Sequence, residues 1–320
     1  MFSLICVQGL TKRYGGKLAL DNADFAIEEG RVVGLLGLNG AGKSTTMNIL
    51  TGCVSATAGT VTIDGYDIAT HPRQAKGVTG YLPEQPAFYP EMKVRDHLDF
   101  VCALKGIAAA GRKRHIADIC ALVGLEDAQG RMVRNLSKGY RQRLGFAQAL
   151  VGGPKAIILD EPTAGLDPSQ IIEIRRLIKD SGRRATVIVS SHILSEVQAV
   201  CDRVIVLRQG RIIADCHTDE MVGRLASGAR ARVRVQGGAD AIQAALRGVP
   251  GMGSVRRLAQ NEPGAWDFAL ESADGADIRA RVFRALAAAD LPLLAVHSAD
   301  ASLEEAFLSL AVGAGEEGAP

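Results

Sequence analysis

The chain has 320 residues, of which 37 are lysine or arginine and 35 are aspartate or glutamate, so its formal net charge is +2. This length is typical of about two domains, each large enough to bury a core of its own. The balanced charge gives no global basic field of the kind that nucleic-acid-binding proteins use, and no nucleic-acid partner is expected.

The sequence contains no pattern typical of a secretion signal, a membrane helix or a zinc site. The N-terminus lacks a basic region followed by a long apolar segment. No stretch reaches the roughly 18 uninterrupted apolar residues that a membrane helix needs, so any role at a membrane requires a partner. The six cysteines are scattered without a C-x-x-C pair, which suits reduced thiols in the cytosol.

The first strong pattern in the chain is a glycine-rich loop between a strand and a helix. Short strands are expected ahead of it, at residues 4–8 and 20–27. The apolar residues 32–36 predict a buried strand, residues 37–44 match G-x-x-x-x-G-K-[ST], and residues 46–51 predict a short helix. This order favours a phosphate-binding loop over the plainer alternative, a glycine-rich turn that happens to contain a Lys-Ser pair.

The residue types of this loop suit a triphosphate. Glycines let backbone N–H groups approach phosphate oxygens, and the start of the following helix adds a positive dipole end. Lys43 is predicted to neutralise the β- and γ-phosphates, and Ser44 to place a hydroxyl on Mg²⁺. The chain is therefore predicted to bind a nucleoside triphosphate. The predicted contacts in the loop are Gly37, Asn39, Gly40, Ala41, Gly42, Lys43, Ser44 and Thr45.

The rest of the first two thirds predicts an α/β core with a helical insertion. A hairpin is expected over residues 59–68 and a strand at 78–82. Apolar residues recur at helical spacing from about residue 90 to 150, which predicts the insertion. Strands then alternate with helices, which predicts a largely parallel sheet. The expected strands are 156–159, 186–189, 204–207 and 211–214, and the expected helices are 171–178 and 194–200.

The pattern loosens near residues 222–230, where a domain boundary is predicted. The core domain is expected to span residues 1–225, a small α+β domain residues 230–311, and a flexible tail residues 312–320. A capping box, Ser302-Leu303-Glu304-Glu305, predicts a final helix to about residue 310. The other elements expected in the small domain are strands at 233–235, 255–258, 266–270 and 293–296 and helices at 239–246 and 278–288.

Two adjacent carboxylates follow the predicted strand at residues 156–159. A parallel strand beside a phosphate loop delivers its carboxyl end to the nucleotide. Asp160 can hold Mg²⁺ there, while Glu161 can reach a water in line with the γ-phosphate and act as its base. The plainer interpretation of such a pair is two solvated turn residues.

A second anion site is predicted at residues 136–143, where Ser137 has the features of a helix N-cap. A serine hydroxyl and free N–H groups at the start of a helix can together bind an anion. An ordinary helix cap is the simpler alternative. Taken alone, this segment does not decide between the two.

Together these motifs resemble the ATP-binding subunit of an ABC transporter over nearly all of residues 1–220. The resemblance implies an α/β fold, a P-loop NTPase with an ABC-type core and a helical insertion, followed here by the small α+β C-terminal domain. It also implies ATP and Mg²⁺ as cofactors. The motifs that carry it occur in the family's order, namely Tyr14, residues 37–45, residues 81–85, residues 136–140, Asp160-Glu161, residues 165–168 and residues 190–192.

The resemblance further implies roles for single residues around the nucleotide. Tyr14 is expected to stack on adenine. His192 is expected to contact the γ-phosphate and to fix the geometry of Glu161 and its water. The catalytic residues implied are Lys43, Glu161 and His192. The Mg²⁺ ligands implied are Ser44, Asp160 and Gln85.

The resemblance implies a head-to-tail dimer, formed by two copies of this chain or by this chain and a paired ATPase subunit. Ser137 and Gly139 of one subunit would complete the site of the other, and Asp167 would cross the interface. The usual signature Leu-Ser-Gly-Gly-Gln is altered here, because Lys138 replaces its first glycine and Tyr140 its glutamine. Lys138 either adds positive charge near the phosphates or is simply solvated.

In the coupling loop, residues 81–85, two residues are candidates for the position that the family fills with glutamine. The glutamine expected after the proline is Glu84, with Gln85 next to it, and either could meet the nucleotide site. Both departures are similar to exporter ATPases of the gliding-motility, multidrug and sodium-export group, which pair with separate type-2 permeases. The resemblance thus implies a cytoplasmic ATPase held at the inner face of the membrane by such a permease, driving export.

Two other functions are open to the same core. A soluble ABC-type protein acting on DNA or ribosomes would carry long coiled coils, zinc-binding cysteines or two ATPase units, and the sequence has none of these. A catalytically weak regulatory binder is disfavoured by the complete set Lys43, Asp160, Glu161 and His192. The small C-terminal domain is either a packing or dimer-stabilising module or a regulatory one.

Overall fold

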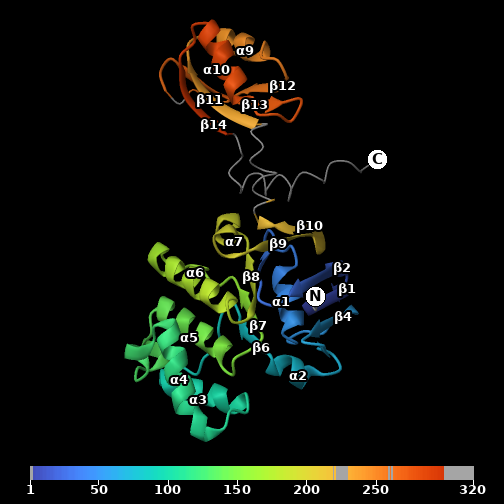
Figure 1. The fold of residues 1–320 in the computed structure, drawn as a ribbon, viewed down its shortest axis with the longest axis vertical. Helices are drawn as coiled ribbons and strands as arrows, with labels where there is room; N and C mark the ends of the chain where they lie inside the picture. The colour runs from blue at the N-terminus through green and yellow to red at the C-terminus, as the bar shows by residue number, and fades with distance from the viewer. Residues whose placement is uncertain (1–2, 219, 221–229, 259, 261, 299–320) are drawn as a thin grey trace. The chain divides into compact units, whose positions relative to one another are not determined.

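A six-stranded sheet forms the centre of the first unit in a computed structural model of the chain (Figure 1). The structure describes residues 3–218, 220, 230–258, 260 and 262–298. The sheet order is β10-β9-β3-β8-β7-β6, and all neighbours are parallel apart from β9 and β10. The strands are β3 (Val32–Leu36), β6 (Thr79–Leu82), β7 (Ala156–Asp160), β8 (Thr186–Ser191), β9 (Arg203–Arg208) and β10 (Arg211–His217).

The middle strands of this sheet are covered on both faces. Every residue of β3, β7 and β8 is buried, which explains their continuous apolar runs. Successive residues of a strand point to opposite faces. Val33 and Leu35 share a core cluster with Met47 of α1 (Lys43–Leu50), whereas Gly34 between them packs directly against Val197 of α7 (Leu194–Val200). α1 and α7 therefore cover opposite faces.

A second, antiparallel sheet packs on the α1 side through the same core cluster. Its order is β2-β1-β4-β5, with strands β1 (Ser3–Tyr14), β2 (Lys17–Glu28), β4 (Ala58–Ile63) and β5 (Tyr66–Asp67). β1 is longer than the strand predicted at residues 4–8, because irregular register shifts let it continue beside β2. α2 (Pro72–Gly77) was not predicted, since its six residues bury only Ala75 and show no apolar periodicity.

The helical insertion lies between β6 and β7. It contains α3 (Val94–Leu104), α4 (Ala109–Val123) and α5 (Lys138–Leu150), with two short 3-10 turns, Glu126–Ala128 and Val133–Asn135, before α5. Lys105, at the end of α3, ties the insertion to the core, because its Nζ donates to the carbonyl oxygens of Lys76 at 2.8 Å and Thr79 at 2.6 Å. Burial lowers the pKa of the Lys105 ammonium. Helix α6 (Pro168–Gly182) lies between β7 and β8.

The second unit begins at Asp219, a few residues before the predicted boundary. Its elements are β11 (Arg230–Gln236), α9 (Ala239–Arg247), β12 (Met252–Arg257), β13 (Ala265–Ser272), α10 (Arg279–Ala288) and β14 (Leu293–Ser298). The antiparallel order β12-β13-β11-β14 is that of a ferredoxin-like βαββαβ fold. The predicted fold class, an α/β core with a small α+β domain, is confirmed; the predicted final helix and tail lie outside the described residues.

Candidate functional site

The phosphate loop runs from β3 into α1, which begins at Lys43, directly after Gly42, where the sequence predicts that the helix opens. Its N-cap, Gly42, has a φ of 110°, in the left-handed region that favours glycine. A Cβ there would lie 2.8 Å from Ala19 O and 2.9 Å from Leu20 Cδ2, so a side chain does not fit. Among the described residues no side chain caps α1. Its first N–H groups are therefore available to an anion.

Lys43 lies across the mouth of this loop. Its side chain is almost fully buried, and Nζ donates a hydrogen bond of 2.7 Å to Gly37 O. The same nitrogen lies 3.5 Å from Glu161 Oε1. The ammonium therefore links the phosphate loop to the carboxylate after β7, two segments far apart in the sequence.

Asp160 and Glu161 are held in place by one hydroxyl group. Both side chains are buried. Ser190, which pairs with Asp160 across β7 and β8, donates from Oγ to Asp160 Oδ1 at 2.5 Å and accepts from the Glu161 N–H at 2.9 Å. The sequence did not single out this residue, although its motif, Ser190-Ser191-His192, was recognised. Ser190 thus fixes where the strand ends and the turn begins.

Glu161 is turned away from Asp160 by an unusual backbone. Its φ of 47° lies in the left-handed region, which costs a non-glycine residue about 1 kcal/mol. The turn brings Glu161 Oε2 within 3.0 Å of His192 Nδ1, while Oε1 faces Lys43. The carboxylate is therefore held between a lysine and a histidine, and His192 itself remains about half exposed, at 45%. This is a geometry that suits a base acting on a nearby water.

A cavity of about 410 Å³ opens over these groups. Its remaining walls come from Lys17, Ala19, Leu38 and Ala164, which the sequence did not indicate. Tyr14 is at its edge, half exposed, with Lys12 Nζ 4.8 Å from the ring centre. The predicted site residues that line the cavity are Tyr14, Asn39, Gly40, Gly42, Lys43, Ser44, Thr45, Glu84, Glu161 and His192.

Four predicted residues of the same subunit do not line the cavity. Gly37 and Ala41 form the back of the loop, where a Cβ on Gly37 would lie 2.6 Å from Leu207 O. Asp160 lies behind Glu161, bonded to Ser190. In the coupling loop Glu84 lines the cavity, whereas Gln85, the Mg²⁺ ligand that the resemblance implies, does not.

The signature segment lies apart from this cavity. Ser137 caps α5 by accepting from the Tyr140 N–H at 3.4 Å. Asp167 caps α6, accepting from Ser169 Oγ at 2.6 Å and from the Gln170 N–H at 2.9 Å, and these bonds lower the pKa of its carboxyl. Gly139 packs against the Gln170 side chain, so a Cβ at Gly139 would require the Gln170 amide group to move. None of these three residues, Ser137, Gly139 and Asp167, lines the cavity of its own subunit.

One further side chain joins the signature helix to the carboxylate turn. Gln142 of α5 is buried, and its Nε2 donates to Pro162 O at 2.7 Å, one residue after Glu161. A glutamine at a buried position of an amphipathic helix is a signal for such a contact, but the sequence does not identify its acceptor. The turn that carries Glu161 is therefore hydrogen-bonded to residues of both α5 and β8.

Replacing Ser190 by alanine is expected to lower the kcat for ATP hydrolysis about tenfold, because Asp160 and the Glu161 N–H both lose a partner. Steady-state phosphate release at saturating ATP measures this. The matched control is Ser191→Ala, since Ser191 Oγ donates to Glu196 at 3.1 Å and contacts neither carboxylate. Equal kcat values for the two variants would show that Ser190 does not position the pair.

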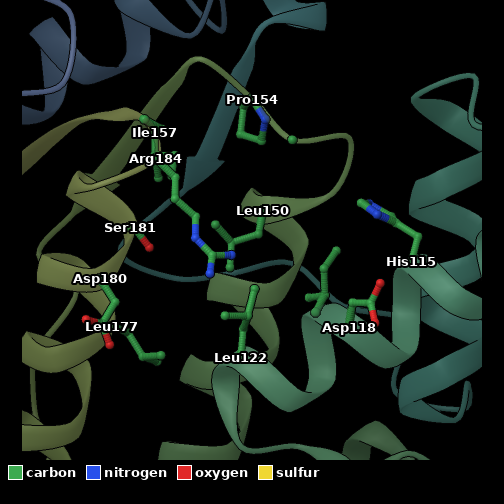
Figure 2. A pocket seen from close by; sticks show the side chains of 13 residues that line it. His115, Asp118, Leu122, Leu150, Pro154, Ile157, Leu177, Asp180, Ser181 and Arg184 are labelled. Carbon is green, nitrogen blue, oxygen red and sulfur yellow. The ribbon is translucent and has the colours of Figure 1, made fainter.

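A second cavity, of about 310 Å³, lies between α4 and α6 and is lined by none of the predicted site residues (Figure 2). Figure 2 shows Leu122, Leu150 and Leu177 on its walls, with Arg184 extending from the α6 side toward Leu150. Its lining combines the carboxylates of Asp118 and Asp180 with the guanidinium of Arg184, which is no cluster of cations for a triphosphate. The phosphate chemistry therefore belongs to the first cavity.

Comparison with known proteins shows which family this chain is similar to. A family model described as ABC transporter matches residues 20–164. The uncharacterised ABC transporter ATP-binding protein YxlF of Bacillus subtilis is 35% identical over 209 residues, which cover 65% of this chain and 69% of that protein. The bacitracin transport ATP-binding protein BcrA of Bacillus licheniformis is 35% identical over 226 residues, covering 70% and 73% respectively.

A solved structure of the ATP-binding subunit of an ABC transporter is similar as well. It is 30% identical, with a TM-score of 0.63, and the match covers 69% of this chain and 92% of that one.

Proposed function

This chain belongs to the family of ABC transporter ATP-binding proteins, and on that basis we propose that it hydrolyses ATP to drive substrate export through a separate membrane permease. The observation that carries the proposal is the position of Glu161, with one carboxylate oxygen 3.5 Å from Lys43 Nζ and the other 3.0 Å from His192 Nδ1. A carboxylate fixed at the mouth of a phosphate loop can accept a proton from a water that attacks the γ-phosphate.

The phosphate loop binds the triphosphate of ATP. The uncapped start of α1 and the glycine backbone direct N–H groups at phosphate oxygens. Lys43 then exchanges its bond to Gly37 O for the β- and γ-phosphates. The aromatic Tyr14 at the cavity edge offers a face for adenine. These groups hold ATP with its γ-phosphate toward Glu161.

The donor set also fits Mg²⁺. Ser44 lines the cavity, and the carboxylate of Asp160 is buried. A hydroxyl oxygen and a carboxylate oxygen are the hard ligands that this ion prefers. Glu84 or Gln85 of the coupling loop could add one more oxygen. Bound Mg²⁺ supplies charge neutralisation at the β- and γ-phosphates. Ser190 orients Asp160 for this role through the 2.5 Å hydrogen bond.

A second subunit completes the site. Ser137 and Gly139 lie at the N-terminus of α5, where N–H groups and the helix dipole favour an anion, yet they do not line the cavity of their own subunit. Head-to-tail pairing of two copies brings each signature to the other's γ-phosphate, and Asp167 then lies at the interface. ATP favours the closed pair and hydrolysis reopens it.

Transport takes place in a partner. Within the described part of the chain, no helix has both the length and the apolar character to cross a bilayer. By its family, we propose that the subunit works at the cytoplasmic face of a membrane, on a permease of the type-2 class. The helical insertion and the coupling loop pass the motion to that permease.

Mixing two inactive variants tests the shared site. Lys43→Ala removes the phosphate-loop cation, and Ser137→Arg blocks the signature. In a mixed head-to-tail dimer one site carries both defects and the other carries none. Random pairing makes half of the dimers mixed, so about a quarter of wild-type ATPase activity is expected to return. Each variant mixed with wild type serves as the control for pairing.

Activity in the mixture no higher than that of the separate variants, with pairing shown by cross-linking, would contradict a site shared between two subunits.

A further inference from the structure

A buried histidine in the helical insertion contacts elements that the proposed function must couple. His97 lies on α3 and is 2% exposed. Its Nε2 lies 2.9 Å from Gln148 Oε1 of α5. An amide oxygen can only accept, so Nε2 carries the proton and donates this bond. The remaining polar atom of the ring is Nδ1.

That Nδ1 is buried and has no hydrogen-bond partner among the described residues. A buried polar atom without a partner destabilises the arrangement that contains it. A phenylalanine would fill the same volume between aromatic neighbours and leave no polar atom unpaired. Packing alone thus does not explain an imidazole at this position, whereas the hydrogen bond from its other nitrogen does.

The ring of His97 also contacts the segment that follows the coupling loop. The Phe88 ring meets it edge-on, with centroids 5.4 Å apart, and the Tyr89 ring lies 6.3 Å away. Tyr89 packs in turn on Phe100 of the same helix, at 5.4 Å. Phe88 and Tyr89 follow Glu84 and Gln85 by only a few residues. The position of the His97 ring therefore depends on the position of this segment.

The other partner, Gln148, belongs to the helix that carries the signature. α5 begins after Ser137 and packs tightly on the coupling loop, since a Cβ on Gly145 would lie 2.5 Å from Leu82 Cδ1 and 3.1 Å from Pro86 Cγ. A displacement of residues 82–89 cannot occur without pushing on α5. The hydrogen bond from His97 holds α5 at a second point, toward its C-terminal end.

We propose that His97 is a positioning residue that keeps the signature helix aligned with the coupling loop, through its hydrogen bond to Gln148 and its contacts with Phe88 and Tyr89. The inference rests on the proposed function, because it requires that the N-terminus of α5 serves ATP bound to a second subunit. His97 contacts no nucleotide and does not line the cavity.

Two substitutions separate the hydrogen bond from the packing. His97→Gln places an amide N–H near the position of Nε2 and keeps the donor, whereas His97→Phe keeps the ring and removes the donor. His97→Phe is expected to lower the kcat for ATP about tenfold with KM for ATP within twofold, because the phosphate loop is untouched. His97→Gln is expected to retain kcat within about threefold, since the bond to α5 survives.

Gln148→Leu tests the same bond from the other side and keeps the proposal testable if His97→Phe fails to fold. It is expected to lower kcat as His97→Phe does. The double variant is expected to be no slower than either single variant, because the two substitutions remove the same hydrogen bond. The matched control is His115→Phe, the same change in the same insertion, at a histidine whose Nε2 accepts from the Gly152 N–H at 3.0 Å.

Melting temperatures measured alongside show whether each variant is folded. A folded His97→Phe with wild-type kcat, or loss of activity in His97→Gln but not in His97→Phe, would overturn the proposal. So would additive losses in the double variant. If the wild-type protein itself shows no ATPase activity, the proposed function fails instead, and the two failures are therefore distinguishable.

Discussion

Glu161→Gln is expected to lower the kcat for ATP hydrolysis by a factor of about 10² to 10⁴, the range for removal of a general base. Glutamine keeps the shape of the side chain between Lys43 and His192 but cannot take a proton from the attacking water. Binding of ATP is retained, because none of the phosphate-loop groups changes. Phosphate release under single-turnover conditions measures the loss.

The same variant is expected to accumulate as a dimer with ATP. Hydrolysis normally reopens the pair, so a site that binds ATP without cleaving it holds the subunits together. Size-exclusion chromatography with light scattering, with and without ATP, detects the change in mass. Glu91→Gln is the control, since Glu91 forms an exposed ion pair with Arg134. Unchanged turnover in Glu161→Gln, or a strict monomer with ATP at high concentration, would refute the assigned role.

Lys43→Ala is expected to weaken ATP binding by a factor of about 100 or more, because charge-assisted bonds to the β- and γ-phosphates are lost. The change also leaves Glu161 without the ammonium 3.5 Å away, so a second negative charge faces the phosphates unscreened. Hydrolysis falls to background. Titration with a fluorescent ATP analogue and a phosphate-release assay measure the two effects.

Lys17→Ala is the control for this variant, because Lys17 lines the same cavity but stands outside the phosphate loop. Its effect on affinity is expected to stay within a few-fold, as for an exposed cation. If Lys43→Ala bound and hydrolysed ATP like the wild type, residues 37–44 would not be the phosphate loop.

Local patterns predicted much of this fold. The strand at residues 32–36 and the helix at residues 194–200 have the predicted bounds, since continuous apolar runs and helical spacing are properties of neighbouring residues. The order of strands and helices in the second unit was also predicted. The short helix Pro72–Gly77 was missed, because one buried alanine gives no periodicity to detect. The predicted bounds of the domains stay a prediction.

The sequence by itself determined the phosphate loop, the two carboxylates after the strand and the family, because each of the motifs consists of residues that are close together in the sequence. The tertiary structure decided which distant groups meet them. Ser190 under Asp160 and Gln142 on Pro162 are separated by twenty or more positions. The physical reason is that strand pairing and helix packing set such contacts, and periodicity shows which face of an element is buried but not which residue of another element it meets.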